Sequence, residues 1–272
     1  FVYKDTSDTS YHAYDVGACC YPLILEIDGD WVWFTAPGCD QVGRLSRQTG
    51  DVDTFDVAPT GSYPADLAVA SDGSVWFTQM QADQLAHLVV TSTVDYGIET
   101  TEAPSMDGGR PYGVVLAGIS VYVAQTANGK VSEYTPSTDF WVDVVVPGVS
   151  QVDYPYKLAR GNSDHVWATE RAGNRITRFD YGTFAVLVSY DLEPAGSSPM
   201  GLAAGVDDDL WFTQWSAGQI GRLATESEVI TYYPLSSSRL LPTGIEVEGS
   251  HVWVVATKPY QVYLPLVMRS GG

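Results

Sequence analysis

The sequence predicts an all-β protein, a six-bladed β-propeller of four-stranded antiparallel blades. Two observations support this prediction: a repeat that occurs six times at intervals of 42 to 47 residues, and strand-type segments separated by turns within each copy. A period of this length made of four short strands is typical of a propeller blade. The copies begin at Pro22, Pro64, Pro111, Pro155, Pro199 and Pro242.

Each copy is expected to supply four strands in the same order. A short apolar strand follows the proline, a turn of Gly, Asp or Ser comes next, and the second strand surrounds a motif of the type Trp-Phe-Thr. A polar loop leads to a third strand of the type Gln-Ile-Gly-Arg-Leu, and a fourth strand ends the copy. The segments alternate in polarity and are rich in β-branched and aromatic residues, which favours strands over helices. The expected blades span 22–57, 64–98, 111–146, 155–192, 199–235 and 242–267.

The sixth copy ends after its third strand, around 262–267. The N-terminal segment 11–16 precedes Pro22 as the fourth strand of the first copy precedes Pro64. We therefore expect it to complete the last blade and close the ring, which would remove two exposed sheet edges. Residues 1–272 are predicted to form a single propeller domain.

The strongly negative net charge of the chain argues against anionic partners. The chain has 14 Lys and Arg against 33 Asp and Glu, a net charge of −19. A field of this sign repels phosphate, so we expect no nucleic-acid partner and no docking on an anionic membrane. No apolar run approaches the ~20 residues that span a bilayer, so we expect no membrane insertion. The start at Phe1 resembles a processed terminus, and we expect an exported bacterial protein, extracellular or on the cell surface.

One face of the predicted propeller collects aromatic and amide side chains. The links between blades and the loops after each second strand share this face. Such a surface suits a small molecule, glycan or protein ligand with flat apolar parts and hydroxyl or amide groups. The alternative is structural, with tyrosines as spacers between blades and glutamines as caps of backbone groups. The candidate ligand-binding residues are Tyr21, Tyr63, Gln79, Arg110, Tyr112, Gln125, Tyr154, Tyr156, Gln214 and Trp215.

Two glutamates interrupt a position that is otherwise small or apolar. The fourth residue after the proline is Glu26 in the first copy and Glu246 in the sixth, and these copies are neighbours in a closed ring. Two carboxylates near the axis could hold a divalent cation, Mg²⁺ or Ca²⁺. Alternatively they pair with Arg160 or with backbone amides, or face solvent between blades, and we favour this structural alternative.

The three cysteines lie in the first copy and on one face. Cys19 and Cys20 belong to the link before Pro22, and Cys39 lies in the loop after the second strand. A disulfide from Cys39 to either Cys19 or Cys20 suits an exported protein. One thiol is then left over.

The repeat resembles that of the streptogramin (virginiamycin B) lyase family of β-propellers. The match to the family's repeat is best in residues 199–223 and 64–88, and it extends more weakly over all six copies. The resemblance implies a seven-bladed ring that opens a cyclic depsipeptide by elimination, with a bound Mg²⁺ and a histidine base in a Glu-Pro-His-Gly motif. The last copy here reads Leu241-Pro242-Thr243-Gly244, so the acid and the base of that motif are absent.

Three functional hypotheses follow from these observations. The first is a secreted, non-catalytic binding or scaffold propeller. The second is a cation-dependent lyase or lactone hydrolase, with Glu170 and Asp66, or Glu26 and Glu246, as carboxylates and Lys157 as the base. The third is a structural surface or assembly protein in which exposed aromatics such as Trp141 contact identical copies. The absence of the acid and the base of the Glu-Pro-His-Gly motif favours the first hypothesis.

Overall fold

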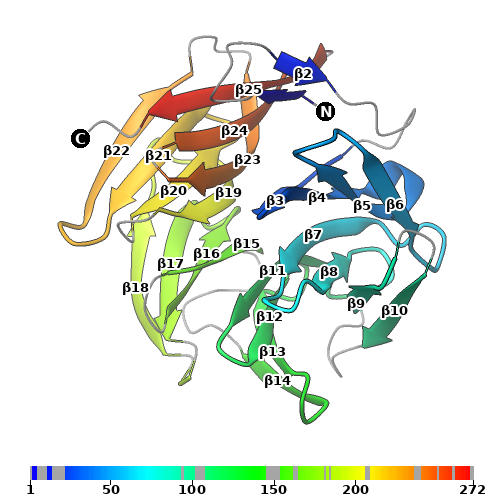
Figure 1. Ribbon diagram of the computed structural model, residues 1–272. Helices are drawn as coiled ribbons and strands as arrows, with labels where there is room; N and C mark the ends of the chain where they lie inside the picture. Colours follow the sequence, from blue (N-terminus) through cyan, green and yellow to red (C-terminus); the bar gives the residue numbers. More distant parts are fainter. Residues whose placement is uncertain are drawn as a thin grey trace. The chain divides into compact units, whose positions relative to one another are not determined.

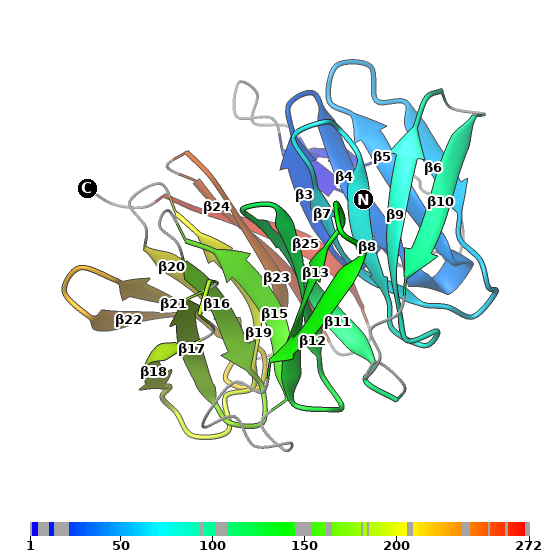
Figure 2. The ribbon, with the colours of Figure 1, turned by 90° about the horizontal axis from the view of Figure 1, so that it is seen from below.

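The computed structural model describes residues 2–4, 11–13, 22–92, 95–101, 108–144, 154–161, 165–180, 182–183, 185–205, 209–235, 240–249, 251–258 and 261–269. The described chain is an all-β propeller (Figures 1 and 2). Its one helical element is the 3₁₀ turn η1 (Pro37–Cys39), and no helix in the described part is long and apolar enough to cross a membrane.

Five sheets have four antiparallel strands each, hydrogen-bonded in chain order. The first sheet consists of β3 (Leu25–Asp28), β4 (Trp31–Ala36), β5 (Gln41–Ser46) and β6 (Val52–Asp56). The second consists of β7 (Pro64–Val69), β8 (Val75–Gln79), β9 (Gln84–Val90) and β10 (Tyr96–Thr101). The third consists of β11 (Pro111–Ala117), β12 (Ser120–Gln125), β13 (Lys130–Thr135) and β14 (Phe140–Val144).

The fourth and fifth sheets repeat this plan. The fourth consists of β15 (Pro155–Arg160), β16 (His165–Glu170), β17 (Arg175–Asp180) and β18 (Val186–Asp191). The fifth consists of β19 (Pro199–Ala204), β20 (Leu210–Gln214), β21 (Gln219–Ala224) and β22 (Val229–Pro234). The predicted strand order within a copy is therefore confirmed for five copies.

The prediction of six four-stranded blades is wrong, because the structure has five. The sixth copy forms a three-stranded sheet of β23 (Leu241–Glu248), β24 (His251–Lys258) and β25 (Gln261–Arg269), and within the described chain β25 pairs only with β24. The segment expected to close it instead forms β2 (Tyr11–Ala13), which pairs with β1 (Val2–Lys4), and β1 lies against β25 (Figure 1). Residues 14–16 lie outside the described residues. Within the described residues β1 and β2 form a separate two-stranded sheet, so the hairpin lies beside the last sheet and does not extend it.

The chain divides into two compact units. The N-unit comprises Phe1 and Tyr14–Val146, with the first three sheets, and the C-unit comprises Val2–Ala13 and Pro147–Gly272, with the remaining strands. Each unit is described below by itself. The expectation of a single domain stays a prediction.

Apolar side chains fill the space between successive sheets within each unit. In the N-unit, Trp33 and Phe55 are stacked with ring centroids 6.0 Å apart, and both pack against Leu67 and Phe77 of the second sheet. In the C-unit, Trp211 of the fifth sheet packs against residues of the three-stranded sheet in the same way. Each large side chain buried in this way contributes about 1.5–3 kcal/mol to stability.

Buried threonines of the Trp-Phe-Thr motif link neighbouring sheets. Each hydroxyl donates to the backbone carbonyl one residue after the proline of the next sheet, and each threonine is fully buried. The third copy has Ala124 at this position, which has no hydroxyl to donate. The donor–acceptor pairs are Thr35 Oγ1 to Ala65 O (3.1 Å), Thr78 Oγ1 to Tyr112 O (2.6 Å), Thr169 Oγ1 to Met200 O (3.1 Å) and Thr213 Oγ1 to Thr243 O (3.1 Å).

Candidate ligand-binding site

The residue before the proline adopts a left-handed backbone conformation in four copies. The φ angles are 59° for Tyr63, 48° for Arg110, 49° for Tyr154 and 54° for Ser198. This conformation is uncommon for residues with a side chain and costs about 1–3 kcal/mol. Such strain persists where surrounding contacts hold it, and it often accompanies binding sites. It therefore draws attention to the face formed by these links and by the loops after the second strands, which we call the link face.

Backbone hydrogen bonds from the loops hold these strained residues on one side. The amide of Met80 donates to Tyr63 O at 3.0 Å, Arg171 N to Tyr154 O at 3.1 Å, and Trp215 N to Ser198 O at 3.0 Å. Each loop after a second strand is thus fastened to the link of its own sheet. The side chains of link and loop residues are brought close together by this backbone pairing.

Short polar side chains hold the same links from the preceding sheet. The Asp40 carboxylate accepts hydrogen bonds from the Tyr63 amide (3.1 Å) and the Gly61 amide (2.6 Å). Asp83 accepts from the Arg110 amide at 2.8 Å, and Asn174 Oδ1 accepts from the Ser197 amide at 2.7 Å. Asp40, Asp83 and Asn174 themselves have positive φ, which short Asx side chains tolerate better than most residues. The backbone of the link face is therefore preorganised.

Three side chains of the C-unit form a cation–π cluster on this face. The Arg171 guanidinium lies over two aromatic rings, with its Cζ 5.6 Å from the Tyr156 ring centroid and 5.5 Å from the Trp215 ring centroid. All three side chains are partly exposed. Tyr154, whose carbonyl holds the Arg171 amide, is 40% exposed. A flat ligand group could stack here, and a polar group could meet the guanidinium edge.

The sequence identified two members of this cluster, together with the neighbouring Tyr154, and missed Arg171. Tyr154, Tyr156 and Trp215 are predicted ligand-binding residues, and the structure brings Tyr156 and Trp215 onto one arginine. Arg171 escaped the sequence analysis because it stands one residue past the position compared across the copies, which Glu170 occupies. Its neighbour Trp215 stands at the matching position of the next copy, and that correspondence was the signal available.

In the N-unit the predicted residues are more dispersed. Tyr63 is partly exposed and Arg110 is exposed on the link face. Tyr112 is buried, at 5% exposure, and its carbonyl accepts the hydrogen bond from Thr78. Tyr21 lies outside the described residues. The N-unit thus presents one tyrosine and one arginine from the predicted set.

The predicted amide residues Gln79 and Gln214 face inward. Both are fully buried. Gln79 Nε2 donates to the backbone carbonyl of Ala58 at 2.7 Å, and Gln214 Nε2 donates to Glu193 O at 3.1 Å. Both carbonyls belong to the link that leads into the glutamine's own sheet, before Pro64 and Pro199 respectively. This placement favours the structural alternative, in which the glutamines cap backbone groups.

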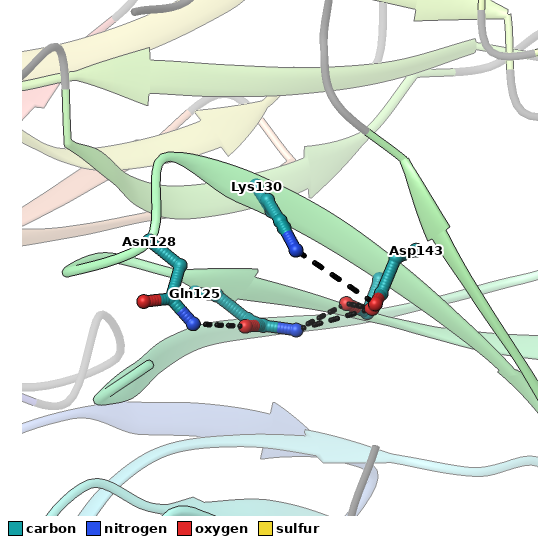
Figure 3. Close-up of polar contacts among 5 residues, drawn as sticks. Gln125, Asn128, Lys130 and Asp143 are labelled. Atoms are coloured by element: carbon teal, nitrogen blue, oxygen red, sulfur yellow. Dashed lines mark hydrogen bonds and ion pairs between the residues drawn. The ribbon is translucent and has the colours of Figure 1, made fainter. Parts of the chain in front are cut away.

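Gln125 belongs to a polar chain inside the third sheet (Figure 3). It is fully buried, accepts a hydrogen bond from Asn128 Nδ2 at 2.9 Å, and donates to Ser132 Oγ at 2.5 Å. Ser132 Oγ donates to Asp143 Oδ1 at 2.8 Å, and the Lys130 ammonium lies 3.9 Å from the other oxygen of Asp143. This network of polar side chains connects the loop after β12 to the outermost strand β14. Gln125 therefore has a structural role in the third sheet.

Glu170, a candidate catalytic acid, occupies the same position in the fourth sheet. Its carboxylate is fully buried, pairs with Arg175 Nε at 2.5 Å and accepts a short hydrogen bond from the Thr177 hydroxyl. Both oxygens are thus engaged by residues of β17. A carboxylate held in this way stabilises the sheet, and Arg171 next to it points to the rings of the link face instead.

The remaining catalytic candidates, Asp66 and Lys157, follow their prolines by two residues. Asp66 is fully buried, and its Oδ2 accepts a hydrogen bond from the Val114 amide at 2.9 Å, which ties the second sheet to the third. Lys157 is partly buried in the C-unit, where its amide donates to Thr169 Oγ1 at 3.0 Å. Their catalytic roles stay predictions.

Comparisons with known proteins place these features in a family context. The model of the virginiamycin B lyase family matches residues 143–263. A curated virginiamycin B lyase from Nocardia farcinica is 26% identical over 86% of this chain and 76% of its own length. A streptogramin B lyase structure is 25% identical, with a TM-score of 0.80, over 92% of this chain and 81% of that chain. The chain is virginiamycin B lyase-like.

Further structures share the fold. A catalytically inactive variant of virginiamycin B lyase from Staphylococcus aureus, solved with quinupristin, has a TM-score of 0.81 at 24% identity, over 92% of this chain and 83% of that chain. A luciferin-regenerating enzyme has a TM-score of 0.70 at 12% identity, over 94% of this chain and 93% of that chain. Proteins of different activity thus share this architecture, so function has to be argued from the site.

The metal candidates of this virginiamycin B lyase-like chain lie in different units. Glu26 Oε1, in the N-unit, accepts a hydrogen bond from the Val69 amide at 3.2 Å, as the backbone alternative predicts. Glu246 lies on β23 in the C-unit, opposite Trp253. Within the described residues, no three His, Cys, Asp or Glu side chains gather as a metal site would require. A cation at either glutamate stays a prediction.

Cys39 is disulfide-bonded in the structure. Its expected partners, Cys19 and Cys20, lie outside the described residues. The choice between these two cysteines stays a prediction.

Proposed function

We propose that this virginiamycin B lyase-like propeller binds a small ligand at the link face of the C-unit. The ligand has a flat apolar part together with hydroxyl, amide or other polar groups. The observation that carries the proposal is the Arg171 guanidinium held over the rings of Tyr156 and Trp215 on a strained, hydrogen-bonded backbone. Rings and a cation fixed before binding lose little conformational entropy when a ligand arrives.

Binding without turnover is the form of this proposal that the chain's own residues support. Glu170 is buried and engaged by Arg175 and Thr177, and the last copy has Thr243 where the family motif has histidine. We therefore propose that the ligand is released unchanged.

The test is a binding screen against glycans and cyclic peptides with the full chain, read by calorimetry. The double variant Tyr154→Ala with Tyr156→Ala is expected to abolish binding, because it removes the exposed ring and one side of the cation–π cluster. The matched control is Tyr190→Ala, which removes a tyrosine of the same unit that stacks on Trp167 in the sheet. Unchanged affinity in the double variant would remove the site from consideration.

A second candidate function rests on the curated lyase relative. An elimination on a cyclic depsipeptide would remove a proton next to the ester and break the ester C–O bond, giving a C=C bond and a free acid. We propose to incubate the chain with quinupristin and Mg²⁺ and to follow the reaction by chromatography and fragmentation, because the product is an isomer of the substrate. A linear product would replace the non-catalytic proposal, with Glu170→Gln the first variant to examine.

An exported location is proposed on separate grounds. Cys39 is disulfide-bonded, and disulfides persist mainly in oxidising compartments. Secretion of the protein, followed by thiol labelling of the extracellular fraction, tests this proposal. A cytoplasmic protein with three reactive thiols would contradict it.

A further inference from the structure

The guanidinium edge of Arg171 has no acidic partner among the described residues. Its Cζ lies over the rings of Tyr156 and Trp215, and both of these contacts are to uncharged groups. The in-plane N–H groups of a stacked guanidinium remain available for hydrogen bonds. Arg171 is partly exposed, so a ligand can reach it.

Two other stacked arginines of the described chain, Arg44 and Arg222, have a carboxylate partner, whereas Arg178 over Trp167 has none recorded. Arg44 lies over the Trp31 ring with its Cζ 4.1 Å from the centroid and pairs with Asp53 at 2.9 Å. Arg222 lies over Trp211 and donates to Asp209 through its Nε at 2.6 Å. An aromatic face combined with a carboxylate on the edge is thus an arrangement this fold builds more than once. At Arg171 the rings are in place, and no carboxylate of the described residues pairs with it.

We infer that Arg171 receives a carboxylate of the ligand, bound through its guanidinium edge while the group lies over the rings of Tyr156 and Trp215. The inference rests on the proposed binding function and specifies its ligand class. Two parallel N–H···O bonds between guanidinium and carboxylate are strong and directional. Contact with two rings restricts the fork in advance, so little rotamer entropy is lost on binding.

A monocarboxylate fits this site better than a phosphate. The chain carries a net charge of −19, and its field opposes a dianion more than a monoanion. In addition, Arg171 is one cation held by uncharged rings, which balances one negative charge. The ligand that the geometry selects is therefore a small aromatic or cyclic molecule with a single carboxylate.

The test compares benzoate with benzamide, which has the same ring and a neutral amide in place of the carboxylate. Binding to the full chain is measured by calorimetry and by the NMR shift of the Arg171 Nε–H. We expect benzoate to bind about tenfold more tightly than benzamide, because a hydrogen bond to a charged group is worth more than a neutral one. Arg171→Gln should remove this preference, and Arg171→Lys should restore only part of it, since lysine lacks the planar fork.

The matched control is Arg178→Gln. Arg178 also stacks on an aromatic ring, with its Cζ 5.3 Å from the Trp167 centroid, but it lies on strand β17 within the sheet. This variant should keep the preference for benzoate. Thermal unfolding of each variant verifies that it is folded.

Each outcome decides a separate question. Equal binding of benzoate and benzamide, unchanged in Arg171→Gln, would overturn the carboxylate inference and leave the proposed binding function standing. Failure of both probes to bind would overturn both. Tighter binding of phenyl phosphate than of benzoate would overturn the monocarboxylate assignment in favour of a phosphate.

Discussion

The ring of Phe34 on β4 lies directly over Gly43 on β5. A Cβ placed on Gly43 would stand 2.2 Å from the ring Cζ, far inside contact distance. The same pair recurs in the fifth sheet as Phe212 over Gly221. The glycine of the repeat therefore makes room for the phenylalanine of the preceding strand.

Gly43→Ala is expected to lower the free energy of unfolding by about 1–3 kcal/mol, because the added methyl group overpacks a fully buried ring. The measurement is chemical denaturation. Gly97→Ala is the control, since a Cβ at Gly97 meets nothing within 4 Å. Equal stability of the two variants would contradict the packing explanation.

A second prediction concerns the threonine links between sheets. Thr78 Oγ1 accepts a hydrogen bond from the Asp66 amide and donates to Tyr112 O, in a fully buried position. Thr78→Val leaves both backbone groups without this partner, so we expect a loss of about 1–3 kcal/mol in the free energy of unfolding. The control is Thr100→Val on the exposed strand β10, which should change stability little. The explanation fails if both variants unfold at the same denaturant concentration.

The buried ion pair of the fourth sheet can be tested by removing its acid. Glu170→Leu removes the carboxylate that pairs with Arg175 and accepts from Thr177, and we expect a loss of about 2–4 kcal/mol, somewhat discounted because Arg175 is partly exposed. Glu226→Leu, at an exposed carboxylate, is the control. A Glu170 variant as stable as wild type would show that this carboxylate is kept for another purpose, and would reopen its catalytic assignment.

The stacked pair Trp76 and His87 predicts a pH dependence of stability. Their ring centroids lie 4.1 Å apart at an interplanar angle of 10°. Burial lowers the pKa of His87 below its usual value near 6.5, although Asp72 and Glu99 act in the opposite direction. The unfolded chain therefore binds a proton before the folded chain does.

The free energy of unfolding is therefore expected to decrease as the pH falls. The contribution of His87 is fully present above its unfolded pKa and is lost as the pH falls through the unfolded pKa towards the lowered folded value. Unfolding free energies from pH 7.5 to pH 4.5 should thus fall more steeply for the wild type than for His87→Phe, which keeps the stack and does not titrate. If the unfolding free energies of the wild type and of His87→Phe fell equally with pH, His87 would not be the source of the pH dependence.

The strands were predictable because their signal is local. Trp-Phe-Thr motifs consist of residues that favour strands, and the structure places Trp31–Ala36, Val75–Gln79 and Leu210–Gln214 in second strands of their sheets. The closure of the sixth blade was not predictable from the same signal. Strand propensity does not report which partner a strand will pair with, and the structure pairs β2 with β1.

The site was predictable only in its residue types. Tyrosines beside the prolines and glutamines after the second strands stood out in the repeat, but both types occur equally well in a core. The structure turned Gln79 and Gln214 inward and left Tyr154 exposed. Arg171 aligns with Trp215 in the repeat, but this alignment does not report which ring a flexible side chain will reach.

The sequence by itself determined the all-β repeat, the strands of each copy and the family resemblance, because these depend on side-chain alternation and turn residues a few positions apart. The tertiary structure alone decided the number of four-stranded blades, the burial of Glu170 and Asp66, and the placing of Arg171 over the rings of Tyr156 and Trp215. These features depend on pairing between segments distant in the chain, where packing decides the outcome and local pattern carries no information.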